Sequence, residues 1–243
     1  GGTDPATGKG VLMARTASKK MDMDDLPTLR DALLEATLPH IAFDGWSAQA
    51  LRHGAADIDL PPEAVERAFP GGAAEAVAHF IAHADRRMLE ALEAMDLPSM
   101  KVRERIATAI RVRLEQAAEH KEAVRKALAF TALPQHAGLA LKSLYRTVDA
   151  IWYAAGDTAT DYNFYTKRAL LAGVYSTTLL YWLEDKSEGH EATWAFLDRR
   201  IANVMSLPKL GGKLRGVAGK LPNPFLLFRG PKGRRRGPFR PAA

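Results

Sequence analysis

Helical periodicity is the feature of this sequence that most restricts the folds open to it. From Leu26 onward, apolar residues recur at spacings of three and four, and no segment has the alternating pattern of a half-buried strand. Proline and glycine separate the periodic segments, most clearly at residues 70–72 and at Gly156. The sequence therefore predicts an all-α fold with about nine helices.

The expected helix boundaries follow from these breaks and from capping residues. Ser47 is the expected N-cap of the second helix, and Val102 is expected to face the core from the fifth. The predicted helices cover about residues 26–41, 47–56, 63–69, 73–92, 98–114, 121–130, 136–155, 160–183 and 188–207.

The distribution of charge divides the chain further. Residues 209–243 hold ten Lys/Arg and no acidic residue, although the formal net charge of the whole chain is only +6. The remaining residues carry 24 basic and 28 acidic side chains, so the body is mildly acidic and the basicity belongs to the tail. We expect a disordered lead-in at 1–25, a helix-turn-helix-like part at 26–72, a helical bundle at 73–207 and a basic amphipathic tail at 208–243.

Composition excludes several classes of protein. The chain has no cysteine, which rules out disulfide frameworks, thiolate zinc sites and cysteine nucleophiles. No apolar run approaches the roughly 20 residues that a membrane-spanning helix needs. We therefore expect a soluble or peripheral protein.

The first three predicted helices are short and precede a longer one. This layout resembles that of TetR-type helix-turn-helix regulators, whose other helices enclose a ligand cavity. Residues 28–80 carry three basic and eight acidic side chains, however, and the helix in the recognition position presents Glu63 and Glu66 beside Arg67. Because phosphate contacts need donors or positive charge, we predict no sequence-specific DNA binding. A TetR-like ligand-responsive transcriptional regulator is the alternative function.

Two histidines and a glutamate form the strongest metal-like pattern in the sequence. Glu75, His79 and His83 recur every four residues, on one helical stripe. Histidines at this spacing arise often by chance, and no further cluster supplies another ligand at a recognisable spacing, so we expect no metal site. The other histidines stand apart from any nucleophile or Gly-rich phosphate loop. The sequence thus predicts no catalytic residues, no cofactor and no enzymatic activity.

Aromatic residues gather in a predicted helical hairpin at residues 152–168. Tyr162, Phe164 and Tyr165 fall within four positions, so they cannot all face one core. At least one is expected on the surface or in a cavity. Beside polar residues such as Asp161, they have the composition of an interaction hot spot. The alternative is that they are core side chains with polar tips.

One residue pattern runs through this hairpin and beyond it. Its members are Trp152, Tyr153, Ala155-Gly156-Asp157, Thr160-Asp161, Asn163, Tyr165-Thr166, Arg168-Ala169, Leu171-Ala172, Tyr175, Thr177-Thr178, Thr193-Trp194, Phe196-Leu197 and Arg200. The pattern resembles the signature of the lipid-binding accessory proteins of ubiquinone (coenzyme Q) biosynthesis, the ninth family in the Coq series. The resemblance spans roughly residues 28–206 and is specific from about residue 148. It implies a TetR-like fold that does not act as a transcription factor.

The resemblance also implies a function. Members of this family bind lipids, including polyprenylated quinone intermediates or phospholipid, and present substrate to the di-iron demethoxyubiquinone hydroxylase. The residues it places on or near the partner surface are Trp152, Tyr153, Asp161, Asn163, Phe164, Tyr165 and Arg168. Phe164 departs from the tryptophan usual in the family, which removes an indole N–H donor.

The helix after the hairpin is the expected lipid-binding element. The lipid-binding residues predicted there are Leu171, Tyr175, Ser176 and Leu179. Ser176, Thr177 and Thr178 are candidates to meet a polar head group. The small residues Ala169, Ala172 and Gly173 leave room for a cavity or for close helix packing, and the residues alone do not choose between these.

The basic tail has an apolar stripe at positions i, i+4, i+7 and i+11, which is typical of a helix lying in a membrane interface. The predicted membrane-binding residues are Leu210, Lys213, Leu214, Val217, Leu221, Phe225 and Phe228. A merely solubilising tail is the alternative. We expect peripheral binding to an anionic membrane surface, either the cytoplasmic face of a bacterial inner membrane or the matrix face of the mitochondrial inner membrane. By resemblance to TetR-like proteins, we also expect a homodimer.

Overall fold

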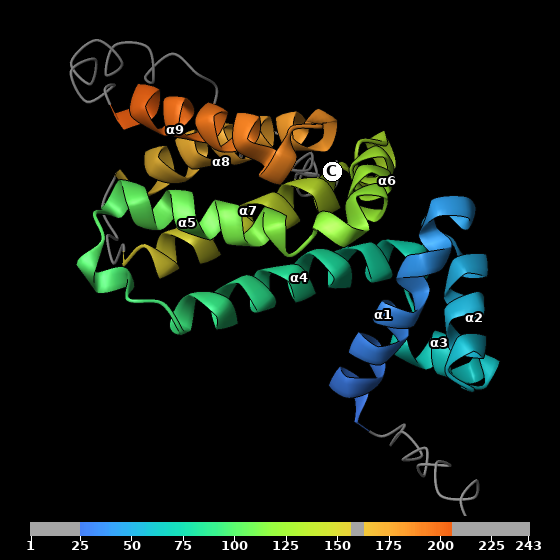
Figure 1. Cartoon of the computed structure of the whole chain (residues 1–243). Helices are drawn as coiled ribbons and strands as arrows, with labels where there is room; N and C mark the ends of the chain where they lie inside the picture. The colour runs from blue at the N-terminus through green and yellow to red at the C-terminus, as the bar shows by residue number, and fades with distance from the viewer. Residues whose placement is uncertain (1–24, 157–162, 206–243) are drawn as a thin grey trace, which may run out of the picture. The chain divides into compact units, whose positions relative to one another are not determined.

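The computed structural model describes residues 25–156 and 163–205, and every regular element in these ranges is helical (Figure 1). The α-helices are α1 (Leu26–Asp44), α2 (Ala48–Asp57), α3 (Pro62–Ala68), α4 (Gly72–Glu93), α5 (Val102–Glu115), α6 (Lys121–Thr131), α7 (Ala137–Ala154), α8 (Asn163–Glu184) and α9 (Glu191–Met205). The short 3-10 turns are η1 (Leu97–Ser99), η2 (Ala118–His120), η3 (Pro134–His136) and η4 (Glu188–His190). The predicted all-α class is confirmed for this part of the chain. Within the same ranges, no helix combines the length and the apolarity needed to cross a membrane.

The chain divides into two compact units, residues 1–198 and 199–243. The second unit contributes only the last turns of α9 to the described structure. The boundary expected between the helix-turn-helix-like part and the bundle, after residue 72, falls inside the first unit. The reason is that α1 packs against both α4 and α6. Apart from Asp25, the predicted lead-in lies outside the described residues, as does the whole predicted tail.

Capping side chains begin the first two helices. Asp25 accepts hydrogen bonds from the backbone N–H of Thr28 at 3.4 Å and from the Thr28 hydroxyl at 2.6 Å. Ser47 accepts a hydrogen bond from the backbone N–H of Ala50 at 3.2 Å, which confirms the predicted N-cap. These side chains satisfy N–H groups that the first turn of a helix leaves without a partner.

Close packing holds the helix-turn-helix-like part together and ties it to the bundle. A Cβ atom at Gly54 of α2 would lie only 2.8 Å from the backbone of Thr37 in α1, so the two helices approach this closely because the residue is glycine. The indole Nε1 of Trp46 donates to the carbonyl of Ala123 in α6 at 3.1 Å. Its ring centroid lies 5.1 Å from that of Phe80 in α4. These contacts of Trp46 hold the turn after α1 against α4 and α6.

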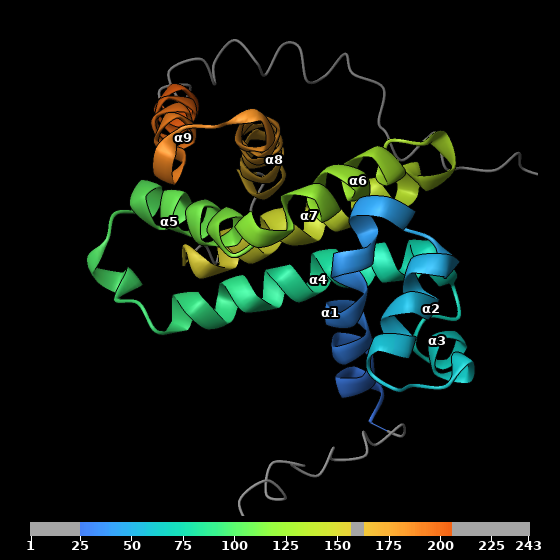
Figure 2. The same ribbon diagram turned by 45° about the vertical axis from the view of Figure 1, so that its right-hand side comes forward.

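The bundle is built from α4, α5, α7 and α8. Figure 2 shows α4 and α7 running side by side, and it views α8 nearly end-on. Val148 and Ile151 of α7 are buried, as is Val174 of α8. The predicted break after α7 is confirmed, because Gly156 adopts a φ of 81°, the left-handed conformation that ends helices.

Two predicted helix starts are wrong. The residues expected to begin the fifth helix form the separate turn η1, and α5 begins only at Val102. Val102 is 44% exposed instead of facing the core, because the first turn of α5 lies at the edge of the packed region. Likewise η4 precedes α9, because Gly189 and His190 have positive φ angles of 58° and 57° that interrupt the helix.

Candidate functional site

A cavity of about 230 Å³ lies between α4, α5, α6, α7 and α8. Apolar side chains form most of its wall, which suits it to an apolar ligand rather than to water. The lining residues are Phe80, Ile81, Arg113, Leu114, Ala117, Val124, Ala127, Leu128, Thr131, Ala140, Ser143, Leu144, Thr147, Tyr175, Ser176, Leu179 and Leu180. Leu180 is 58% exposed although it lines the cavity, so the cavity reaches the surface there.

The cavity has one polar region, built around a buried ion pair. Asp85 of α4 is 4% exposed and accepts a hydrogen bond from Nε of Arg113 at 3.0 Å. The Thr147 hydroxyl lies 3.0 Å from both oxygens of this carboxylate, and Nε of Arg146 lies 3.4 Å from Oδ2. Arg113, Thr147 and Tyr175 face the cavity. A buried charge needs such partners, because leaving it unpaired is costly.

Tyr175 is the group in this region that is best placed to meet a ligand. Burial raises the pKa of its phenol, the Asp85 charge raises it further, and Arg113 opposes them, so the phenol keeps its proton at neutral pH. In the described part of the chain, the hydroxyl makes no hydrogen bond. The phenol of Tyr175 is therefore available to hydrogen-bond a ligand at the edge of an apolar space.

The lipid-binding residues predicted from the sequence fall mostly on this cavity. Tyr175, Ser176 and Leu179 line it, whereas Leu171, one turn earlier on α8, is buried but does not. Of the three hydroxyl residues expected to meet a head group, only Ser176 lines the cavity. Thr177 and Thr178 donate to carbonyls of their own helix at 2.7 Å, and such local bonds satisfy their hydroxyls. Whether the lining residues bind lipid stays a prediction.

Sequence reasoning missed the ion pair of the cavity. Asp85 lies three residues before Met88 and four after Ile81, on the apolar stripe of α4. An acidic residue on a core stripe is a signal of a buried partner. The partner itself, Arg113, comes from another helix and has no local signature.

The predicted partner-binding residues separate into exposed and buried groups. Tyr153 is 77% exposed and Tyr165 is 70% exposed, which confirms that aromatic side chains of the hairpin reach the surface. Trp152 is only 8% exposed, with Nζ of Lys167 lying 5.7 Å from its ring centroid. Arg168 is 7% exposed and donates from Nε to Oδ1 of Asp149 at 2.8 Å. Trp152 and Arg168 are therefore largely buried in this chain, and their place on or near the partner surface stays a prediction.

The remaining predicted positions are not described. Asp161 and the side chains of Asn163 and Phe164 lie outside the described residues, as do all the predicted membrane-binding positions. Partner binding by the hairpin stays a prediction.

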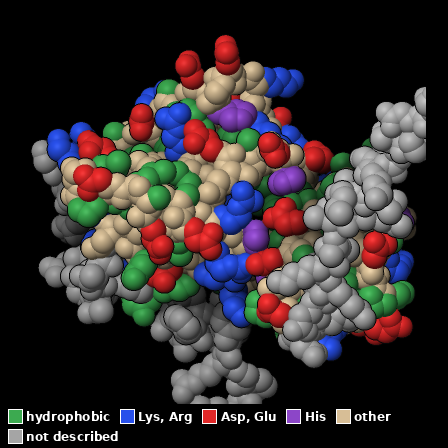
Figure 3. All heavy atoms as spheres, turned by 60° about the horizontal axis from the view of Figure 1, so that its bottom comes forward, with side chains coloured by type: hydrophobic (Ala, Val, Ile, Leu, Met, Phe, Trp, Pro, Cys, Tyr) green, Lys and Arg blue, Asp and Glu red, His purple; other side chains and the backbone are tan. Residues whose placement is uncertain are grey.

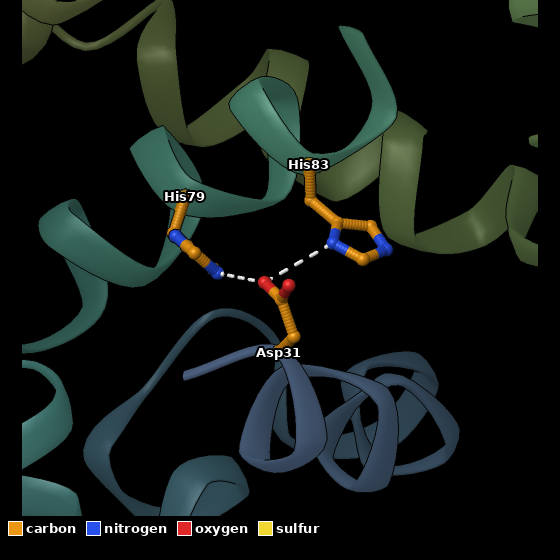
Figure 4. Close-up of side chains that lie close together, drawn as sticks. All are labelled: Asp31, His79 and His83. Atoms are coloured by element: carbon orange, nitrogen blue, oxygen red, sulfur yellow. Dashed lines mark hydrogen bonds and ion pairs between the residues drawn. The ribbon is translucent and has the colours of Figure 1, made fainter. Parts of the chain in front are cut away.

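A polar cluster joins α1 and α4. Oδ1 of Asp31 lies 2.7 Å from Nε2 of His79 and 3.2 Å from Nδ1 of His83 (Figure 4). Glu75, which the sequence places on the same stripe, instead forms an ion pair with Arg30. Figure 3 shows a face on which histidines lie among acidic and basic side chains. Asp31 is thus a third potential ligand, which the prediction of no metal site had not found.

The helix order and the cavity define the class of protein: an all-α protein with a TetR-like fold. A crystal structure of a TetR transcriptional regulator from Nitrosomonas europaea matches with a TM-score of 0.61, covering 74% of this chain and 99% of that one. The two sequences are 22% identical, so this likeness concerns the fold alone. It confirms the TetR-like architecture expected from the sequence.

Sequence comparison identifies the family. The family model for COQ9 matches residues 137–208, which include α7 and α8. The ubiquinone biosynthesis protein COQ9, mitochondrial, of Drosophila melanogaster is 33% identical over 221 residues, covering 87% of this chain and 68% of that protein. The proteins of the same name from Xenopus tropicalis and Homo sapiens are 36% and 31% identical, covering 74% and 76% of this chain and 58% and 60% of their own. The chain belongs to the COQ9 family.

Proposed function

We propose that this chain is an accessory protein of ubiquinone biosynthesis that binds a polyprenylated quinone intermediate and presents it to the demethoxyubiquinone hydroxylase at a membrane surface. Membership of the COQ9 family supports the biosynthetic role, since its relatives are named ubiquinone biosynthesis proteins. The observation that carries the lipid-binding part is the apolar cavity with Tyr175 at its polar region. In this proposal the partner enzyme performs the reaction and this chain has no catalytic step of its own.

The size of the cavity indicates which part of such a ligand it would hold. A cavity of roughly 150 Å³ is large enough for benzene, so about 230 Å³ suits a substituted six-membered ring. A polyprenyl tail is far larger than this space. It would leave through the opening at Leu180, where its apolar surface would be buried against lipid or a partner.

The location is part of the proposal. We propose peripheral binding to an anionic membrane through residues 208–243, and a homodimer as the assembled form. The relatives are named as mitochondrial proteins, which is consistent with the matrix-face alternative. This chain spans 58% to 68% of the length of these three relatives, so partners and assembly are proposed for it rather than transferred.

The DNA-binding alternative gains little from the structure. The exposed residues of α3 include Glu63 and Glu66, so the helix in the recognition position presents acidic side chains to solvent. Acidic side chains repel phosphate and cannot supply the contacts on which DNA affinity rests.

Filling the cavity tests the lipid-binding proposal. The full-length wild-type chain is purified without added lipid, and the ligands that copurify are extracted and identified by mass spectrometry. We expect a prenylated quinone or a phospholipid with the wild type. Ala140→Phe places a large ring in the cavity wall. Overpacking by this ring should cost about 1–3 kcal/mol of ligand-binding free energy and so reduce the retained ligand by about tenfold.

Ala132→Phe is the matched control, because Ala132 is exposed and does not line the cavity. It should retain as much ligand as the wild type. A wild-type chain that is reproducibly free of lipid would contradict the proposal, as would equal retention by Ala140→Phe.

A further inference from the structure

The polar cluster between α1 and α4 has the composition of a metal site. His79 and His83 lie one turn apart on α4 and point toward Asp31 of α1 (Figure 4). One ligand atom from each residue lies within 4.8 Å of the others. Two imidazoles and one carboxylate are a donor set that zinc and similar divalent cations take up in proteins, with a further position left for water.

The distances in this cluster are close to those that such a cation requires. Ligand bonds of about 2.1 Å in a tetrahedral site place the donor atoms about 3.4 Å apart. Oδ1 of Asp31 already lies 3.2 Å from Nδ1 of His83. The 2.7 Å between the same oxygen and Nε2 of His79 would have to widen by about 0.7 Å, which a side-chain rotation can supply.

A second carboxylate orients one of the imidazoles. Nε2 of His83 lies 3.2 Å from Oε1 of Glu35, on the side of the ring away from Asp31. In the tautomer with its proton on Nε2, beside Glu35, the ring of His83 keeps the lone pair of Nδ1 directed into the cluster. Metal-binding histidines commonly have such a carboxylate behind them, because it fixes the tautomer and raises the basicity of the ligating nitrogen.

The guanidinium of Arg86 lies beside Asp31 and His83, where it supplies the positive charge that a bound cation would otherwise supply. Its Nη2 lies 2.7 and 2.8 Å from the two oxygens of Asp31 and 3.1 Å from Nδ1 of His83. The Arg86 side chain is 45% exposed, so it can move into solvent. A metal cation and Arg86 would therefore compete for one position.

We propose that Asp31, His79 and His83 form a binding site for a divalent cation of the zinc type, and that Arg86 competes with the cation for it. The site lies apart from the cavity and is independent of the proposed lipid-binding function. A bound cation links α1 to α4, and so joins the helix-turn-helix-like part to the bundle.

The proposal is tested with the full-length chain carrying no affinity tag. The protein is treated with a chelator, dialysed and titrated with Zn²⁺ in competition with a chromophoric chelator, with Co²⁺ absorption as a second readout. We expect one equivalent of saturable binding. Asp31→Asn and His83→Gln should each weaken the affinity by about tenfold or more, whereas Arg86→Gln should strengthen it by removing the competitor.

Two matched histidine variants control for the loss of an imidazole. His136→Gln removes a histidine that stacks on Phe130 outside the cluster, and it should leave the affinity unchanged. His53→Gln tests a second group of possible ligands, His40, Asp44 and His53, and should also leave it unchanged. The proposal is overturned if the wild type shows no saturable binding, if the affinity survives both Asp31→Asn and His83→Gln, or if His53→Gln alone abolishes it. Far-ultraviolet circular dichroism confirms that each variant is folded.

Discussion

At the scale of single residues, Asp85 is a buried charge on which the stability of the bundle depends. Its carboxylate is 4% exposed and is held by Arg113, Thr147 and Arg146. Burial disfavours the charge of Arg113, but Tyr175 and Asp85 outweigh it and raise the pKa of the guanidinium, which stays charged. The two charges therefore depend on each other, and removing either leaves the other buried without compensation.

We predict that Asp85→Ala lowers the free energy of unfolding by about 3–5 kcal/mol, because it leaves Arg113 as an uncompensated buried charge. Urea unfolding measured by circular dichroism checks this value. The double variant Asp85→Leu with Arg113→Met should recover most of the loss, since apolar pairs often replace buried ion pairs at little cost. Asp198→Ala, at an exposed aspartate, is the control and should change stability by less than about 0.5 kcal/mol. A loss as small as that for Asp85→Ala would mean that the ion pair is not a structural requirement.

At the scale of elements, periodicity predicts most helices but not the turns that begin some of them. The break at Gly156 and the N-cap at Ser47 are encoded locally, by a residue type that suits the required conformation. The turn η4 depends on positive φ angles at Gly189 and His190, and positive φ is too uncommon outside glycine for the presence of a histidine to predict it. The start of α9 could therefore not be read from the sequence.

Asp185 organises the same turn. Its carboxylate accepts hydrogen bonds from the backbone N–H groups of Ser187 and Thr193 at 2.8 and 2.9 Å, and from both hydroxyls. Partial burial opposes ionisation, but these hydrogen bonds outweigh it and hold the pKa of Asp185 well below its ordinary 3.8. These hydrogen bonds join the end of α8 to the start of α9.

We predict that Asp185→Ala costs about 1 kcal/mol of stability at pH 7. Because the folded-state pKa is depressed, the contribution is fully present above the unfolded-state pKa of about 3.8 and is lost as pH falls toward the folded-state pKa. The difference from wild type in urea unfolding should therefore shrink below about pH 4. Glu188→Ala, at an exposed acid in the same turn, should show no such pH dependence. A difference that stayed constant down to pH 2 would contradict the role of the ionised carboxylate.

At the scale of the whole molecule, the sites depend on residues far apart in sequence. Asp31 and His79 are 48 residues apart, and Asp85 and Arg113 are 28 apart. Neither pair has a local spacing that periodicity or motif reading detects, so the sequence predicted neither the ion pair nor the third ligand. Tyr175, Ser176 and Leu179 could be predicted because they lie close together on one helix. Helix packing brings these residues together, and this information exists only in the fold.

The exposed tyrosines of the hairpin are the expected contacts with the partner enzyme. We predict that Tyr153→Ala and Tyr165→Ala each weaken binding of the full-length chain to the demethoxyubiquinone hydroxylase by at least about 2 kcal/mol, as expected of aromatic hot spots. Both side chains are mostly exposed in this chain, so the thermal unfolding midpoint should stay near that of the wild type. Binding is measured by calorimetry or pulldown with purified hydroxylase.

Two further variants separate docking from folding. Tyr145, an exposed tyrosine two turns before Tyr153 on α7, is the matched control, and Tyr145→Ala should bind normally. Trp152 is buried, so Trp152→Ala should lose about 3–5 kcal/mol of stability, and any weaker binding would follow from that loss. If Tyr145→Ala weakened binding as much as Tyr165→Ala, the contact would extend along α7 and the hairpin would not be its centre. If Tyr165→Ala unfolded the protein, its role would be structural, because a docking residue acts only when the partner is present.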